Sequence, residues 1–266
     1  MRNGFHASSA WLQTLQQIFT DGIDVAPRGL KTLELQHHAV HLDMSHPVVL
    51  CPARKLSYTF LAAEALWILS GDDRVETIAP YNKNIAQFSD DGHRFYGAYG
   101  PRIMEQFDWV VEKLLEDRDT RQAVMTIWRK KPPKTKDVPC TVAIMFSNRK
   151  GRLHCHVFMR SSDAWLGLPY DVFNFSMLSA KVACSFNRKC RPEDTIELGF
   201  LHLTAASSHL YERNFAEARE CLEDGRAPAG DHVPVDWTLN GDWDAIWESL
   251  MSCRDKSVNP GWRIRP

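Results

Sequence analysis

The chain has 266 residues, of which 44% are hydrophobic and 11% aromatic, so it is long enough to bury a substantial core. Its formal net charge is −1, which excludes a bulk electrostatic field that would attract nucleic acid or an anionic membrane. The seven cysteines are odd in number and form no C-x-x-C pair, a pattern that fits neither a disulfide framework nor a zinc knuckle.

The N-terminal segment lacks the continuous apolar stretch of a secretory signal, and no later run approaches ~18 apolar residues. We therefore expect a soluble protein of a reducing compartment, cytoplasmic in a bacterium or in the host if a phage encodes it. We expect no membrane partner, no direct contact with DNA and no metal.

Hydrophobic periodicity and breaker residues predict the elements of the first half of the chain. They are a helix over 8–22, a strand over 30–44, an apolar helix over 57–73, a long ordered loop over 81–103 and an amphipathic helix over 103–120. The apolar helix contains one carboxylate, Glu64, which needs a partner or a function if it is buried.

The second half is predicted to mix strands with two helices. The strands span 121–129, 140–163 with a hairpin turn at 148–151, and 195–207; the helices span 172–186 and 212–225; the Trp-rich tail over 237–266 is predicted to be irregular. No internal repeat or linker interrupts this order, so we expect one α+β domain over 1–266.

Cys140 follows Pro139 at a predicted strand start, after the basic segment "RKKPPKTKDV". A free cysteine is commonly a small buried hydrophobe, and that reading stays open for Cys140. A nucleophilic thiol has to be reachable and to lie near a cation, and the basic, proline-marked segment favours this second reading.

Polar residues gather in "MRSSDAWLGLPYDVFNF". Arg160, Ser161 and Asp163 supply a guanidinium, a hydroxyl and a carboxylate, a set suited to phosphate or another planar anion. Asp171 stands at the entrance of an apolar helix, where an N-cap role is the alternative to a functional one. Further along, "SSHLYERN" adds His209 and Tyr211, which could equally pack at the edge of the core.

Taken in order, these motifs resemble the thymidylate synthase superfamily. The resemblance rests on Glu64 in "EALWILSGDD", Tyr99 in "YGAYG", Pro139-Cys140, "RSSD", "LGLPYD" and "SHLY", and it runs from about residue 28 to residue 215. It implies a three-layer fold with a mixed sheet, a homodimer with shared active sites, and transfer of a one-carbon unit from 5,10-methylenetetrahydrofolate to C5 of a pyrimidine nucleoside monophosphate.

The resemblance also implies roles for individual residues. Cys140 would be the nucleophile, with Glu64, Tyr99 and Asp171 as the other catalytic residues. The nucleotide would be bound by Arg28, Arg160, Ser161, Asp171, His209, Tyr211 and, donated by the partner subunit, Arg121. The folate would contact Ile85, Asp163, Leu166, Gly167 and Tyr170. A guanidinium such as Arg160 favours the thiolate while it holds phosphate.

Three departures from thymidylate synthases bear on the substrate and the product. Asp171 stands where the synthases have asparagine; an ionised carboxylate only accepts hydrogen bonds, which suits the amino group of cytosine and not O4 of uracil. Thr141 replaces a histidine, as in phage deoxycytidylate hydroxymethylases. Ala86 replaces a tryptophan over the folate, which leaves room for water unless Phe88 or a tail tryptophan fills the gap. Gln122 also replaces an arginine, so phosphate binding would lean on Arg28 or Lys31.

The sequence therefore predicts a cytidylate 5-hydroxymethylase, with deoxycytidylate favoured and cytidylate as the alternative, acting through a covalent bond from Cys140 to C6. Three rivals stay open. They are a reductive deoxycytidylate C5-methyltransferase, a thymidylate synthase acting on deoxyuridylate, and a non-catalytic relative that binds nucleotide or RNA.

Overall fold

A computed structural model describes residues 6–224 and 242–255 of the chain. The remaining parts of the Trp-rich tail, including the segment "NPGWRIRP", lie outside the described residues. No helix in the described ranges is both long and apolar enough to cross a membrane.

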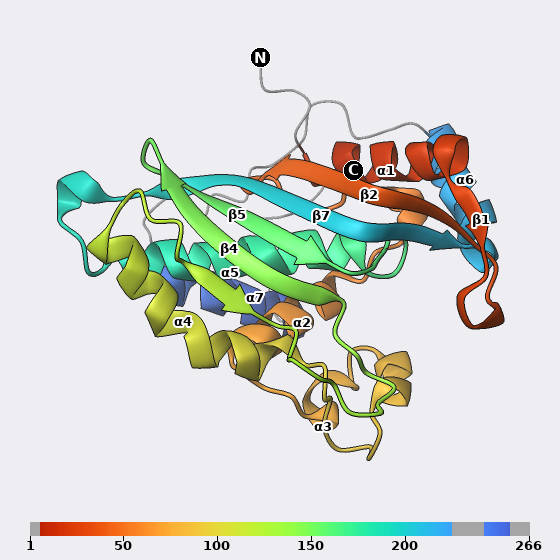
Figure 1. The fold of residues 1–266 in the computed structure, drawn as a ribbon, viewed down its shortest axis with the longest axis horizontal. Helices are drawn as coiled ribbons and strands as arrows, with labels where there is room; N and C mark the ends of the chain where they lie inside the picture. The colour runs from red at the N-terminus through yellow and green to blue at the C-terminus, as the bar shows by residue number, and fades with distance from the viewer. Residues whose placement is uncertain (1–5, 225–241, 256–266) are drawn as a thin grey trace.

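A mixed sheet forms one layer of the molecule (Figure 1). Its strands are β1 (Ile23–Val25), β2 (Thr32–Asp43), β3 (Val124–Thr126), β4 (Thr141–Arg149), β5 (Arg152–Met159), β6 (Ser162–Asp163) and β7 (Glu197–Tyr211). The order is β1-β2-β7-β5-β4-β3, with β6 pairing to β7. The β5–β7 and β6–β7 pairs are parallel and the other pairs antiparallel, which confirms the mixed sheet.

Helices cover one face of this sheet. They are α1 (Ala7–Asp21), α2 (Tyr58–Leu69), α3 (Val75–Ile78), α4 (Tyr99–Glu116), α5 (Leu168–Asn187), α6 (Phe215–Asp224) and α7 (Trp243–Asp255). Figure 1 shows α5 directly behind the central strands, and α2 contacts both α5 and α7. The order sheet, α5, then α2 with α7 gives the three layers of the expected α+β fold.

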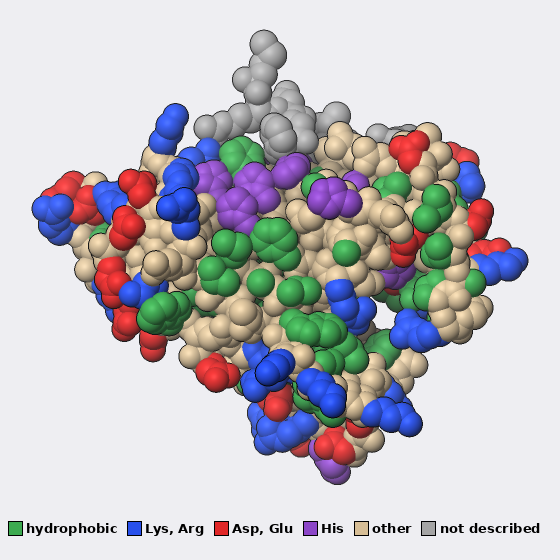
Figure 2. All heavy atoms as spheres, in the orientation of Figure 1, with side chains coloured by type: hydrophobic (Ala, Val, Ile, Leu, Met, Phe, Trp, Pro, Cys, Tyr) green, Lys and Arg blue, Asp and Glu red, His purple; other side chains and the backbone are tan. Residues whose placement is uncertain are grey.

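Alternation along the strands separates a buried face from an uncovered one. In β7, Leu201, Leu203 and Ala205 are buried toward the helices, whereas His202 and Thr204 point the other way. The uncovered face carries a group of histidines beside apolar side chains (Figure 2), and on it the rings of His156 and His202 stack 4.8 Å apart. Among the described parts of the chain, one face of the sheet therefore packs against the helices and the other carries no helical layer.

The hairpin between β4 and β5 turns on Lys150 and Gly151, as the sequence predicts. Both residues have positive φ, 55° and 73°, which fits a two-residue turn whose twist matches the strands. Pairing then runs back to Thr141 opposite Met159, so the chain segments before β4 and after β5 are brought together.

Several element boundaries differ from the sequence prediction. The segment 81–103 is not loop throughout, because it contains a short 3-10 helix at Lys83–Phe88 and α4 already begins at Tyr99. The helix α5 begins at Leu168 instead of residue 172, since Pro169 in its first turn is compatible with a helix start. Asp171 therefore lies inside the helix.

The prediction of an irregular tail was wrong for residues 243–255, which form α7. Ile246, Leu250 and Cys253 are its buried residues and repeat at helical spacing, and Cys253 Sγ lies 3.5 Å from the Tyr58 carbonyl oxygen of α2. Trp243 and Trp247, both in the first half of this segment, obscured the stripe in the sequence.

Truncating the buried stripe of α7 tests this layer. Leu250→Ala is expected to lower the free energy of unfolding by about 2–5 kcal/mol, because Leu250 is fully buried. The matched variant Met251→Ala removes an exposed neighbour and should change it by no more than about 0.5 kcal/mol. Chemical denaturation measures both; equal, small effects would contradict the packing of α7.

Candidate active site

The β4–β5 pairing places Cys140 beside Arg160. The Arg160 backbone N–H donates to the Cys140 carbonyl at 2.9 Å, one step beyond the last strand pair. The guanidinium donates to the carbonyl oxygens of Pro139 at 3.0 Å and Val138 at 2.8 Å. Nη2 thereby lies 3.7 Å from Cys140 Sγ. One arginine holds the segment before the cysteine and faces its sulfur.

Two opposing effects act on the thiol of Cys140. Burial raises its pKa, and the carboxylates of Asp171, Asp137 and Asp163 act in the same direction, whereas Arg160 lowers it. The net pKa lies above the ordinary value, so Arg160 favours the thiolate as expected but does not outweigh the effect of burial on the pKa. The guanidinium offsets only part of the cost of a buried anion.

The short pair β6–β7 brings the polar cluster to the end of the long strand β7. Asp163 pairs with His209, and Ser161 Oγ lies 3.5 Å from His209 Nδ1. His209 is buried, and burial lowers its pKa, so its ring is neutral near pH 7. A neutral imidazole next to a hydroxyl can both donate and accept, which suits a sugar hydroxyl.

Asp163 shapes the turn that leads into α5. Its Oδ1 accepts hydrogen bonds from the backbone N–H groups of Trp165 and Leu166, both at 2.9 Å. Arg54 fixes the same turn from outside, donating to the Trp165 carbonyl at 2.7 Å with its guanidinium carbon 4.5 Å from the indole centre. The turn is thus held rigidly below the strand ends.

Asp171 does not cap α5, so the N-cap alternative was wrong. Gly167 is the N-cap residue, and the Asp171 N–H bonds to the Gly167 carbonyl at 2.9 Å. A Cβ on Gly167 would lie 3.3 Å from Asp171 Oδ2, so the carboxyl group packs over the glycine. Burial raises the Asp171 pKa well above its ordinary value, and the charges of Glu64 and Asp163 add to the rise. This rise in the Asp171 pKa opposes the ionised form on which the expectation of a cytosine base was built, and the ionisation of Asp171 stays a prediction.

Glu64 comes from α2 and meets α5 at Asn174. Asn174 Nδ2 donates to Glu64 Oε2 at 2.7 Å. Burial raises the Glu64 pKa to about 7, and the bond from Asn174 limits the rise. A carboxyl group with this pKa can accept or give a proton near neutral pH, as a general acid or base requires.

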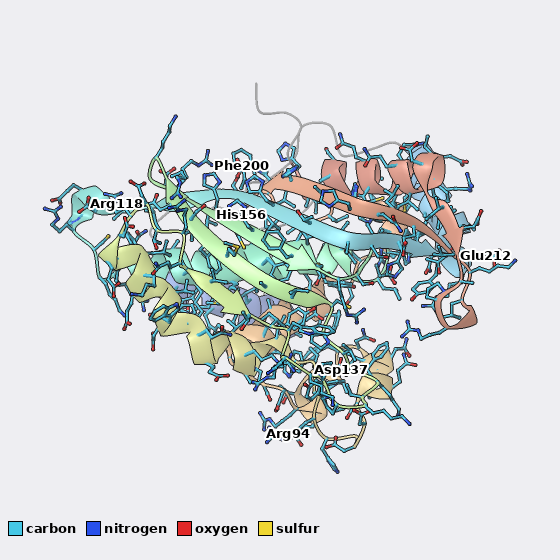
Figure 3. The ribbon with its side chains drawn as sticks, in the orientation of Figure 1. Arg94, Arg118, Asp137, His156, Phe200 and Glu212 are labelled. Carbon is cyan, nitrogen blue, oxygen red and sulfur yellow. The ribbon has the colours of Figure 1, made fainter. Side chains whose placement is uncertain are left out.

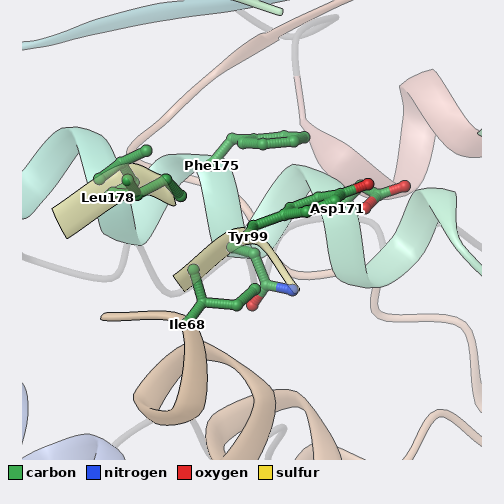
Figure 4. Close-up of a pocket in the computed structure, with 7 residues that line it drawn as sticks. Ile68, Tyr99, Asp171, Phe175 and Leu178 are labelled. Carbon is green, nitrogen blue, oxygen red and sulfur yellow. The ribbon is translucent and has the colours of Figure 1, made fainter. Parts of the chain in front are cut away.

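Tyr99 stands at the start of α4 beside the other catalytic candidates. Its hydroxyl accepts a hydrogen bond from the Thr141 backbone N–H at 3.2 Å, directly after Cys140. Burial raises its pKa, helped by Cys140 and Asp171, so it stays protonated. Behind it a cavity of about 10 Å³ opens between α2, α4 and α5 (Figure 4), lined by Ile68, Tyr99, Ile103, Asp171, Asn174, Phe175 and Leu178.

Arg28 reaches the same end of β7 from the turn between β1 and β2. It has positive φ, 56°, and its Nη2 lies 3.5 Å from the Tyr211 hydroxyl. Lys31, the other predicted phosphate ligand, forms an exposed ion pair with Glu212 at 3.4 Å (Glu212 is labelled in Figure 3). Arg28 is thus joined to the predicted sugar-binding residue, whereas Lys31 is engaged elsewhere.

Arg121 is not brought to the Cys140 of its own chain. The register pairs Thr126 with Ala143, which sets Arg121 roughly level with Asn148 at the opposite end of β4. At about 3.3 Å per residue the separation from Cys140 is on the order of 25 Å. The prediction that Arg121 serves a partner subunit is compatible with this distance and stays a prediction.

Of the predicted folate contacts, Asp163, Leu166, Gly167 and Tyr170 lie in the turn before α5 and in its first turn, whereas Ile85 comes from the separate segment 83–88. Leu166 is 48% exposed, although it is apolar, and Tyr170 packs edge-on to Phe60 with ring centres 5.0 Å apart. Ile85 and Ala86 are partly buried in the segment over 83–88, whereas Phe88 is 48% exposed. Phe88 is thus largely exposed to solvent, and the tail tryptophans Trp237 and Trp262, the other candidates for this space, lie outside the described residues.

Two polar residues of this site were missed from the sequence. Asn174 was read only as part of an apolar helix, and Arg54 was not singled out. The available signal for Asn174 was its spacing, three residues after Asp171 on one helix face, in "DVFN". Among the described residues, no group of three or more His, Cys, Asp or Glu could hold a metal ion.

The electrostatics of Cys140 can be tested by alkylation. We expect iodoacetamide labelling of Cys140 to be slow at pH 7 and to rise through pH 9, because the thiol pKa is raised. Arg160→Gln removes the charge and should slow labelling at pH 8 about threefold to tenfold. Cys190, a partly exposed thiol of the same chain, is the internal control. Mass spectrometry quantifies both; unchanged labelling of Cys140 would contradict a role for Arg160.

Comparison with known proteins agrees with this geometry. The family model described as thymidylate synthase matches residues 9–233. The chain is also 29% identical over 232 residues to a deoxyuridylate hydroxymethyltransferase of Bacillus phage SP01, an alignment that covers 79% of this chain and 58% of the phage protein. The chain thus spans little more than half the length of that relative. On the extent of the family match, this chain belongs to the thymidylate synthase family.

Proposed function

We propose that the protein transfers a one-carbon unit from 5,10-methylenetetrahydrofolate to C5 of a cytosine nucleotide and releases the 5-hydroxymethyl nucleotide. The observation that carries this proposal is the convergence of Cys140 with Arg160, Asp171 and Glu64. Deoxycytidylate is the favoured substrate and cytidylate the alternative. The nucleotide and the folate are the small-molecule partners.

Cys140 acts on C6 of the pyrimidine. Its thiol proton leaves to solvent, the sulfur bonds to C6, the electron pair of the C5–C6 double bond moves to C4–C5, and that of the C4–N3 double bond moves onto N3. Arg160 faces the sulfur and supports the anion as it forms. A nucleotide phosphate in contact with Arg160 would be held by the same side chain.

The neutral, protonated form of Asp171 can bind a cytosine base. A protonated carboxyl group can donate to N3 and accept from the N4 amino group at once. As the sulfur adds, N3 takes the proton of Asp171, and the resulting carboxylate faces a protonated ring. A neutral acid can also pair with O4 and N3–H of uracil, so the preference for cytosine rests on proton transfer to N3, which uracil N3 cannot accept.

The folate supplies the methylene carbon that becomes attached to C5. The choice between a methyl and a hydroxymethyl product then depends on whether hydride or water reaches that carbon. Ala86 is small and Phe88 is turned outward, so the side chains of this segment leave space for water. The hydroxymethyltransferase activity in the name of the phage relative supports the same product.

A second copy of the chain would complete the site. Arg121 lies far from its own Cys140, and the sheet face without helices exposes apolar side chains, including Phe158 at 44%. We infer a homodimer in which these faces meet and Arg121 of each chain reaches the phosphate bound by the other. We also infer that residues 1–266 act as one catalytic domain in the cytoplasm.

The direct test is to incubate the protein with methylenetetrahydrofolate and deoxycytidylate, cytidylate or deoxyuridylate, and to identify each product by mass. We expect 5-hydroxymethyl-deoxycytidylate, with tetrahydrofolate released. A methyl product with dihydrofolate would instead indicate reductive transfer. Release of tritium from 5-tritiated deoxycytidylate should be abolished by Cys140→Ser; equal release from this variant would overturn the proposal.

Replacing Asp171 tests whether this residue selects the base of the substrate. Asp171→Asn restores an amide, which donates to O4 and accepts from N3–H of uracil, and it removes the proton that cytosine needs. We expect the ratio of kcat/KM for deoxyuridylate over deoxycytidylate to rise at least about a hundredfold. Asp43→Asn, a buried carboxyl group paired with Arg152 outside the site, is the matched control and should leave the ratio unchanged. An unaltered ratio in Asp171→Asn would show that other groups select the base.

A further inference from the structure

The amide of Asn174 joins the two carboxyl groups with raised pKa values. Asn174 is only 6% exposed and lies in α5 three residues after Asp171. Its Nδ2 donates to Glu64 Oε2 at 2.7 Å, whereas its Oδ1 is buried and has no hydrogen-bond partner within residues 6–224 and 242–255. A buried acceptor without a partner is costly, so this oxygen calls for a donor.

The cavity beside Asn174 has room for a donor to this oxygen. Asn174 and Asp171 line the same cavity of about 10 Å³, together with Tyr99 (Figure 4), which has room for about one water molecule. A neutral Asp171 can donate its proton toward this space, directly or through a water, and Asn174 Oδ1 can accept it. The other side of the amide meanwhile donates to an ionised Glu64.

We propose that Asn174 is a positioning residue that fixes which carboxyl group carries the proton in the resting site, Glu64 being ionised and Asp171 protonated. Its two ends differ chemically, since Nδ2 can only donate and Oδ1 can only accept. In the reverse distribution Nδ2 would donate to a neutral carboxyl group, which is a weaker hydrogen bond than one to a carboxylate, and Oδ1 would face a carboxylate instead of a donor. This proposal rests on the proposed function, because it supplies the neutral Asp171 that delivers a proton to N3.

Other groups around the pair do not impose this asymmetry. Asp163 and Glu64 both raise the pKa of Asp171, and Glu64 is also close enough to raise that of Tyr170. Tyr99 is neutral, and Cys140 with Arg160 lies on the strand side of Asp171. Among these neighbours, Asn174 is the one bonded to Glu64 that also borders the cavity beside Asp171.

Asn174→Leu removes both ends of the amide at similar volume. The ionised form of Glu64 then loses its donor, so its pKa should rise above about 7, and a neutral Glu64 no longer opposes ionisation of Asp171. In the pH profile of tritium release, the acidic limb should move to higher pH and the alkaline limb to lower pH, each by about one pH unit. Asn174→Ser should shift the limbs in the same directions by less, because water can replace the amide.

Thermal stability gives a second readout that needs no activity. The folded pKa of Glu64 is raised from 4.5 to about 7, so its contribution to stability is fully present below 4.5 and is lost as the pH rises through 7. Loss of the Asn174 donor makes the charged form still less favourable. The decrease in Tm caused by Asn174→Leu should therefore be larger at pH 9 than at pH 5.

The matched control is Asn148→Leu, since Asn148 is also buried, at 3% exposed, with a partnerless Oδ1, but lies near the β4–β5 turn. Its decrease in Tm should not grow with pH in this way, and its pH profile should follow the unaltered protein.

Unshifted limbs, or equal Tm losses at both pH values, in Asn174→Leu would overturn the proposal. If Asn174→Leu does not fold, Asn174→Ser carries both tests. If no nucleotide releases tritium, the proposed function fails and the Tm comparison alone decides the role of Asn174.

Discussion

Burial of charge in one site is the constraint on which the rest of the site depends, and repulsion between carboxylates adds to it at Asp171. The three carboxyl groups are Glu64 from α2, Asp163 at the end of β6 and Asp171 from the first turn of α5. Ionised carboxylates packed this closely, with little water, are strongly unfavourable, so the protons redistribute. Asp163 is stabilised as an acceptor by two backbone N–H groups, which leaves Asp171 as the group most strongly driven to stay neutral.

This redistribution separates two chemical roles without a metal ion among the residues that form the site. A carboxyl group that stays neutral can deliver a proton to a ring nitrogen, and one that titrates near pH 7 can take a proton from a nearby group. The two groups are linked, because the charge of Glu64 adds to the rise in the Asp171 pKa. Asn174 makes the two carboxyl groups inequivalent, because its amide donates a hydrogen bond to Glu64.

The pKa of the proposed nucleophile, Cys140, depends on a similar balance of burial and neighbouring charges. Cys140 is held by main-chain pairing to Arg160, whose guanidinium also binds the carbonyl oxygens of the preceding two residues. In the free protein, burial and the surrounding carboxyl groups raise the pKa of the Cys140 thiol by more than the guanidinium lowers it, so the protonated thiol is favoured. Such a site suits a nucleophile that becomes strongly reactive only once a substrate is bound, because a bound nucleotide changes both the charge and the solvent around it.

The sequence alone determined the family, the mixed α+β architecture and the segments that carry chemistry. Those inferences depend on residue order and on hydrophobic periodicity, which are local properties, as the hairpin over 140–163 illustrates. Tertiary structure decided the direction of the pKa shifts of Asp171 and Cys140, because it buries both groups and brings charges from elsewhere in the sequence beside them, Glu64 of α2 beside Asp171 and Asp171 beside Cys140. It also decided the partner of Glu64: Asn174 is 110 residues away along the chain, and only the packing of α2 on α5 brings the two side chains within a hydrogen bond.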